Sequence, residues 1–271
     1  MRTSSALLTI GAVLAGSLLL AVPGRSLDAE RVINGSAARA EAGSLFASAF
    51  TAYAAGEKDR AFDDYRAAAE MGHIGALWKV GRMHELGDGI EPSPFEAFRA
   101  YRSLASLYGN ISPTDRDAVF VASAFVALGR YLAKGIGERL EADPEAARET
   151  FFYAASYFGD REAQYRLGRM LVDGNGGPPN PSQGVRWLKV ASDKGHVGAT
   201  AVLGELLFDG RYVRSRPVLG LSMLTRARQL ARDENRDWIE SMQERAFAAA
   251  TEEVRRRAVE SAEAELTGTG G

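Results

Sequence analysis

Small and apolar residues recur at helical spacing along most of this chain, and one arrangement of them returns four times. Each copy has an alanine, a glycine five residues later within the apolar run, and a second glycine six residues further on. Glycine is only 29 of the 271 residues, so this register is not a coincidence. It predicts a stack of similar helical units, each burying its apolar face against the next. The copies are Ala76, Gly81 and Gly87; Ala124, Gly129 and Gly135; Ala163, Gly168 and Gly174; Ala199, Gly204 and Gly210.

A second helix is predicted in every copy, and it opens at a proline. Proline suits the first helical position because its missing N–H has no partner there in any case. The prolines are Pro94, Pro144, Pro181 and Pro217. The N-cap residues Ser93, Asp143 and Asn180 precede the first three, whereas Arg216 precedes the fourth. The first three of these helices place an aromatic residue four positions before an alanine, and we expect these aromatics in the core: Tyr101, Phe151 and Trp187.

The two glycines of a copy have different predicted roles. A glycine within a helix costs about 1 kcal/mol relative to alanine, so the internal glycines indicate close approach of a neighbouring helix. The second glycine follows the helical run, where a left-handed C-cap is expected. A further glycine comes two residues later in the first three copies, but Tyr212 has this place in the fourth.

The fold predicted is all-α, a right-handed α-solenoid of helix pairs. Its parts are a signal peptide (1–26), a flexible N-terminal segment (27–43), an N-terminal capping helix pair (44–72), four repeats (73–222) with an insertion near residues 110–116, C-terminal capping helices (223–266) and a disordered tail (267–271).

The first 26 residues are typical of a secretory signal peptide. Arg2 is followed by the apolar run Ala6–Val22 and then by a Pro-Gly pair. Cleavage after Gly24, Ser26 or Ala29 fits the small residues there. The apolar run is nearly as long as a membrane span of about 20 residues, so an uncleaved anchor is the alternative. We predict an exported protein in the periplasm with no stable membrane insertion after cleavage.

Composition and motifs exclude several classes of function. Lys and Arg number 33 against 35 Asp and Glu, which leaves no basic excess for nucleic acid. Cysteine is absent, and with it disulfide frameworks, thiolate metal sites and cysteine nucleophiles. The sequence also lacks a nucleophile elbow, a zinc-protease motif and a phosphate loop. We therefore predict a binding protein that is not an enzyme and needs no cofactor or metal.

One candidate recognition surface follows from the repeat register. The residue after each internal glycine is Arg82, Arg130, Arg169 and then Glu205. Equivalent positions stack in a solenoid, so these side chains form a ladder that can bind an acidic partner segment through its guanidinium groups. The alternative is an ordinary solvated helix face.

Two histidines occupy equivalent places in Gly-His-x-Gly-Ala runs, His73 and His196. Imidazole titrates near pH 6.5, so both are candidate acid sensors whose charging loosens the stack. The alternative is that each histidine simply caps the helix that follows it.

The repeated Ala, Gly, Gly, Pro, aromatic pattern resembles the Sel1-like repeat of the tetratricopeptide superfamily. With the leader and the runs Trp78–Arg82, Phe120–Arg130 and Phe152–Gly159, the chain resembles the ExoR family of exopolysaccharide production negative regulators over roughly residues 45–265. The resemblance implies a periplasmic protein that binds the periplasmic domain of an ExoS-type sensor histidine kinase and inhibits it. It also implies removal by a periplasmic protease under acid or host-derived cues. Periodicity alone gives a binding surface for an unstated partner. The alternatives are a periplasmic scaffold for envelope or polysaccharide-assembly proteins and an enzyme that acts on the cell wall.

Overall fold

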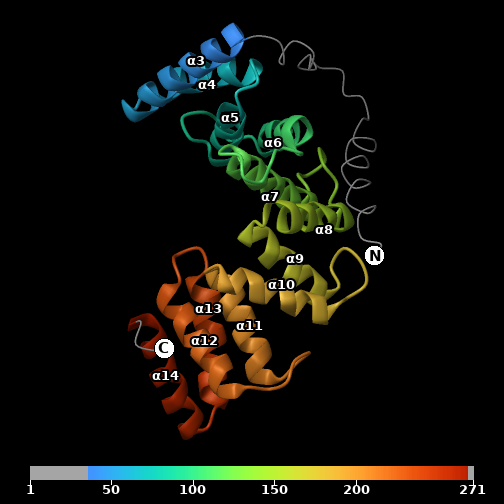
Figure 1. Ribbon diagram of the computed structural model, residues 1–271, viewed down its shortest axis with the longest axis vertical. Coiled ribbons are helices and arrows are strands. Elements are labelled where there is room, and N and C mark those ends of the chain that lie inside the picture. The colour runs from blue at the N-terminus through green and yellow to red at the C-terminus, as the bar shows by residue number, and fades with distance from the viewer. Residues whose placement is uncertain (1–35, 268–271) are drawn as a thin grey trace. The chain divides into compact units, whose positions relative to one another are not determined.

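The computed structural model describes residues 36–267, and this part of the chain is mainly helical (Figure 1). The predicted signal peptide, residues 27–35 and residues 268–271 lie outside the described part. The helices are α3 (Ser36–Ala54), α4 (Lys58–Glu70), α5 (Ile74–Leu86), α6 (Pro94–Tyr108), α7 (Ala118–Lys134), α8 (Pro144–Tyr153), the π-helix η1 (Ala154–Phe158), α9 (Arg161–Asp173), α10 (Pro181–Asp193), α11 (Val197–Asp209), α12 (Pro217–Leu230), α13 (Arg236–Ala249) and α14 (Glu252–Thr267).

The described part of the chain divides into two compact units, the first ending at Phe158 and the second beginning at Gly159. In the first unit α3 packs on α4, α5 on α6 and α7 on α8. In the second unit α9 packs on α10 and α11 on α12, and α13 and α14 both pack on α12. Helices therefore pack mainly against their neighbours in the sequence, as repeats of one supersecondary unit do. This arrangement confirms the predicted all-α solenoid of helix pairs.

Several boundaries differ from those expected. Helix α3 begins at Ser36, so the segment predicted as flexible is helical over residues 36–43. The N-terminal helix pair expected from the sequence corresponds to α3 and α4, and the expected insertion corresponds to the loop between α6 and α7. Helix α12 continues to Leu230, so residues 223–230 belong to the last helix pair and α13 and α14 follow it.

The four prolines begin α6, α8, α10 and α12, as the sequence predicts. The side chains of Ser93, Asp143 and Asn180 each accept a hydrogen bond from the backbone N–H three residues on. Arg216 makes no such bond at the start of α12. Helix α12 therefore starts without the side-chain cap that α6, α8 and α10 have.

The internal glycines of the first unit lie against aromatic rings. A Cβ built on Gly81 would lie 2.7 Å from a ring carbon of Tyr101, and one on Gly129 would lie 2.6 Å from a ring carbon of Phe151. Carbon atoms in favourable contact are about 3.5–4.0 Å apart, so neither site has room for a Cβ. Tyr101 and Phe151 are fully buried, as predicted.

In the second unit the internal glycines face a second glycine on the partner helix. A Cβ on Gly168 would lie 3.0 Å from the carbonyl oxygen of Gly184, and one on Gly184 would lie 2.7 Å from that of Gly168. Gly204 and Gly220 face each other in the same way, at 2.8 and 2.5 Å. The α9–α10 and α11–α12 pairs thus pack backbone against backbone, a contact that only glycine permits.

This difference corrects the prediction for Trp187. Counted from the proline, the residue equivalent to Tyr101 and Phe151 is Leu188, which is 0% exposed, whereas Trp187 is partly exposed. Successive helical residues point about 100° apart, so Trp187, one position before Leu188, points away from the partner helix. Gly184 also brings the two helices close together, and Leu188 then packs directly on Gly168.

The second glycines end their helices as predicted. Gly87, Gly174 and Gly210 adopt the left-handed conformation, and Gly135 also has a positive φ but an extended ψ. Tyr212 has a φ of 67°. This residue therefore adopts, as a tyrosine, the positive φ that glycines adopt in the first three copies.

Candidate binding surfaces

Arg82 and Arg130 meet at one carboxylate in the first unit. Arg82 Nη1 lies 3.1 Å from Glu85 Oε2, and the guanidinium of Arg130, from α7, bonds the other carboxylate oxygen. The hydroxyl of Tyr101 also donates to Glu85 Oε2, at 2.9 Å. Burial and the Glu85 carboxylate raise the pKa of Tyr101 far above its ordinary value, so this hydroxyl remains a donor. The register prediction therefore brings two arginines together, but Glu85 already takes up part of their charge.

Arg169 and Glu205 in the second unit have separate partners. Arg169 Nε lies 3.6 Å from Asp173 Oδ2 on the same helix, and its Nη1 donates to the Tyr165 hydroxyl at 3.3 Å. Glu205 lies 3.5 Å from Arg245 of α13. The ladder of Arg82, Arg130, Arg169 and Glu205 as a partner-binding surface stays a prediction.

His73 is the N-cap residue of α5. Its Nδ1 accepts a hydrogen bond from the backbone N–H of Ala76 at 3.2 Å, and its ring stacks on Phe46 of α3 with centroids 4.2 Å apart. Burial lowers the pKa of His73, while Asp117 raises it and Arg116 lowers it further. A protonated imidazole has no acceptor atom, so charging His73 breaks the cap.

His196 is the N-cap residue of α11, as His73 is of α5, but different groups surround its ring. Its Nδ1 accepts from the N–H of Ala199 at 3.0 Å, and its ring stacks on Tyr165. Its Nε2 lies 2.7 Å from Glu162 Oε2. Burial opposes the charge on Glu162, but its bonds with His196 and Arg166 outweigh burial and lower the pKa of Glu162. His196 therefore caps α11 through one ring nitrogen and bonds to a carboxylate through the other.

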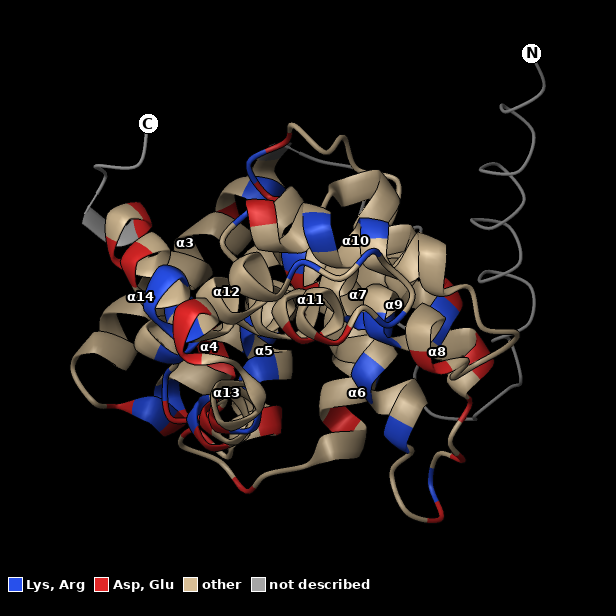
Figure 2. Cartoon of the chain, turned by 90° about the horizontal axis from the view of Figure 1, so that it is seen from below, with Lys and Arg blue, Asp and Glu red and all other residues tan. Residues whose placement is uncertain are grey.

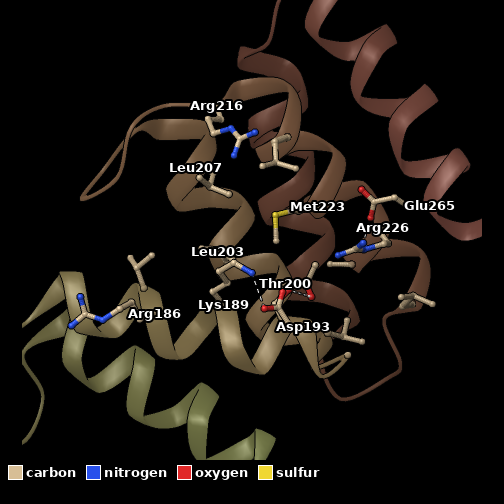
Figure 3. A pocket seen from close by; sticks show the side chains of 17 residues that line it. Arg186, Lys189, Asp193, Thr200, Leu203, Leu207, Arg216, Met223, Arg226 and Glu265 are labelled. Carbon is tan, nitrogen blue, oxygen red and sulfur yellow. Dashed lines mark hydrogen bonds and ion pairs between the residues drawn. The ribbon is translucent and has the colours of Figure 1, made fainter. Parts of the chain in front are cut away.

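A groove in the second unit was not predicted. It has a volume of about 730 Å³ and lies among α10, α11 and α12, with the end of α14 at its edge (Figure 3). Its walls include Leu203 and Leu207 from α11, and Leu219 and Met223 from α12. The sequence signal for it is weak, because these residues also fit an ordinary buried helix face.

Outside the groove, acidic and basic residues occur together on the same helices, as on α13 and α14 (Figure 2). Within residues 36–267, no group of His, Asp and Glu residues is placed to hold a metal ion. In the same range, none of the helices combines the length and the apolar character that a membrane span requires.

Comparison with known proteins identifies the repeat. The Sel1 repeat family matches residues 74–110, 123–155 and 161–196. The chain is 37% identical over 256 residues to the "Exopolysaccharide production negative regulator" of Rhizobium meliloti (strain 1021), covering 93% of this chain and 89% of that protein. The protein of the same name from Rhizobium leguminosarum bv. viciae is 36% identical over 263 residues, covering 96% and 94%.

Solved structures share the fold. A Sel1 repeat protein from Oxalobacter formigenes superposes with a TM-score of 0.54 at 25% identity, covering 69% of this chain and 70% of that one. The protective antigen c5321 of uropathogenic Escherichia coli, which displays an SLR fold, gives 0.53 at 20% identity, covering 84% and 53%. The helix pair α11–α12 lies beyond the residues matched to the Sel1 repeat, but it has the same proline start and internal glycine.

Proposed function

The chain belongs to the family of exopolysaccharide production negative regulators, and we propose that it restrains exopolysaccharide synthesis by binding another protein rather than by catalysis. The observation that carries the proposal is the similarity to two regulators of that name over nearly the whole chain. The Sel1 repeats support a binding role, because stacked helix pairs present long surfaces suited to partner proteins.

The proposed partner is the periplasmic domain of a membrane sensor histidine kinase, reached after export by the signal peptide at residues 1–26. Binding controls the kinase only if the regulator prefers its inactive state. A switch from 1:99 to 99:1 in favour of that state needs a preference of about 5.5 kcal/mol. Loss of the regulator by periplasmic proteolysis then releases the kinase.

Acid relief has a physical basis at His73. Because burial lowers the pKa of His73, the folded protein favours the neutral ring more than the unfolded chain does. The stability gained in this way is present above the ordinary pKa of about 6.5 and is lost as the pH falls through the lowered folded value. Acid therefore weakens the cap of α5 and favours local opening, which a protease needs. The facing groups are Phe46 from α3 and the charges of Asp117 and Arg116 before α7.

The experiment has two parts. Deletion of the gene in its own host is expected to raise exopolysaccharide per cell, and expression of the full chain, but not of a chain lacking residues 1–26, to restore it. An epitope-tagged chain is then used to capture partners from solubilised membranes at pH 7.5 and 5.5. One sensor kinase bound at pH 7.5 and lost at 5.5 supports the proposal. Unchanged exopolysaccharide refutes the role, and capture of polysaccharide-assembly proteins in place of a kinase favours the scaffold.

A further inference from the structure

The groove in the second unit combines an aliphatic floor with a basic rim. Leu203, Leu207, Leu219 and Met223 form the floor, and Leu230 at the end of α12 continues it, half exposed. These residues come from one stripe of α11 and one of α12, so the floor follows the direction of two helices. No aromatic side chain is among the described residues that line it. A surface of this kind suits the apolar face of an amphipathic helix.

The charges on the rim are unevenly compensated. Lys189 is 2.7 Å from Asp193, and Arg226 bonds to Glu265. Arg186 on α10 and Arg216 before α12 also line the groove; both are exposed, and neither has an acidic partner within residues 36–267. In the view of Figure 3 they lie at separate places on the wall, with Leu207 between them. Two guanidinium groups that have no acidic partner in the described part of the chain therefore flank the apolar floor.

We propose that this groove docks an acidic amphipathic helix of the regulated partner, which rests on the function proposed above. Aliphatic side chains of the helix enter the floor, and carboxylates on its edges bond to Arg186 and Arg216. A guanidinium can bind a carboxylate through two parallel N–H···O bonds. The two arginines therefore select an acidic helix and also fix its orientation.

Charge availability favours this groove over the pair at Glu85. Arg82 and Arg130 already share a carboxylate, so an acidic partner must compete with Glu85 for them. Arg186 and Arg216 have no such competitor among the described residues. Arg214, two residues before Arg216 in the loop between α11 and α12, is also exposed.

The test measures binding of the purified periplasmic domain of the sensor kinase to the full mature chain by calorimetry. Arg186→Glu with Arg216→Glu is expected to weaken binding roughly 30-fold or more, because the partner carboxylates then face acids. The matched control is Arg60→Glu with Arg66→Glu on α4, which changes the net charge equally at side chains that are 66% and 58% exposed. The control is expected to bind like the wild type. Added salt is expected to weaken the binding that depends on the two groove arginines, which the wild type and the control retain and the groove variant lacks.

A second pair of variants tests the floor without touching the arginines. Leu230→Glu places an acid at a half-exposed position in the groove, and Leu86→Glu does the same at a 60% exposed leucine in the first unit. Only the former is expected to weaken binding, by about 10-fold. Circular dichroism and the melting temperature check that each variant is folded.

The outcomes separate the two proposals. A wild-type chain that does not bind the kinase domain refutes the proposed function and, with it, the partner assigned to the groove. Wild-type binding that the groove variants leave unchanged refutes the groove alone. A dimer in sedimentation that Arg186→Glu with Arg216→Glu converts to monomer, with kinase binding unchanged, assigns the groove to a second copy and also overturns the proposal.

Discussion

Substitution of Gly220 by alanine tests whether α11 and α12 pack through their backbones. The new Cβ would lie 2.5 Å from the carbonyl oxygen of Gly204, 2.5 Å from the backbone nitrogen of Phe208 and 2.9 Å from its Cα. All three atoms belong to the main chain of α11, so no side-chain rotation relieves the clash. The two helices must separate by about 1 Å or more to restore ordinary van der Waals contacts.

The expected loss follows from two opposing terms. Alanine is about 1 kcal/mol more favourable than glycine within a helix. Overpacking of a close contact costs about 1–3 kcal/mol or more, and here rigid backbone places it at the upper end. The net loss of unfolding free energy is therefore about 2 kcal/mol, which for a whole chain of this size lowers the melting temperature by roughly 4–8 °C.

The assay is urea and thermal unfolding of the mature chain, followed by circular dichroism. Gly43→Ala is the matched control, because Gly43 lies within α3 and a Cβ there meets nothing within 4 Å. The control is expected to gain up to about 1 kcal/mol. If Gly220→Ala raises the melting temperature as Gly43→Ala does, the backbone contact is not tight and the reason given for the paired glycines is wrong.

Three further predictions concern charged and capping side chains. His73→Asn keeps a capping side chain but cannot titrate, so the loss of unfolding free energy between pH 7.5 and 5.0 is expected to be smaller than in the wild type; an equal loss would place the titration elsewhere. Glu85→Gln leaves Arg82 and Arg130 facing each other without a carboxylate and is expected to cost about 1 kcal/mol at low salt and less at 1 M NaCl; a loss that salt does not change would contradict an electrostatic role. Asp160→Ala removes the cap of α9 and is expected to cost about 1 kcal/mol in urea unfolding, whereas Asp160→Asn retains most of it.

Much of the fold is readable from the sequence because its strongest signals are local. Proline at the start of a helix and glycine at its end act through their own backbone, so no knowledge of the partner helix is needed. The internal glycines also indicate close helix contact correctly. The groups that the internal glycines contact are not readable in the same way. Gly184 and Gly220 carry no local signal of their role, and the aromatic pattern selects Trp187 although its neighbour Leu188 makes the contact.

The candidate sites are harder to predict from the sequence than the fold. The repeat register predicts the face on which a side chain lies, but not the neighbouring groups to which it is bonded. Register names Arg82 and Arg130 as equivalent positions, and in the structure both bond to Glu85, three residues after Arg82 on the same helix. That spacing is itself a signal for an ion pair. The histidine runs are likewise equivalent in sequence, but only His196 has a carboxylate at its Nε2. Equivalent positions in the sequence therefore differ in the groups that surround them.

The fourth repeat departs from the pattern of the other three at two residues, and these departures support the binding role proposed for the groove. Arg216 stands where the other copies have a capping side chain, a difference of about 1 kcal/mol in helix stability. Tyr212 adopts a φ of 67° where the other copies have glycine, a conformation that costs about 1–3 kcal/mol. Both departures weaken the fold locally, so packing does not explain them, and both fall in the loop that leads into α12. Arg216 also lines the groove. The proposed binding role for that end of the second unit explains why a stabilising cap is replaced by an exposed cation that has no acidic partner among the described residues.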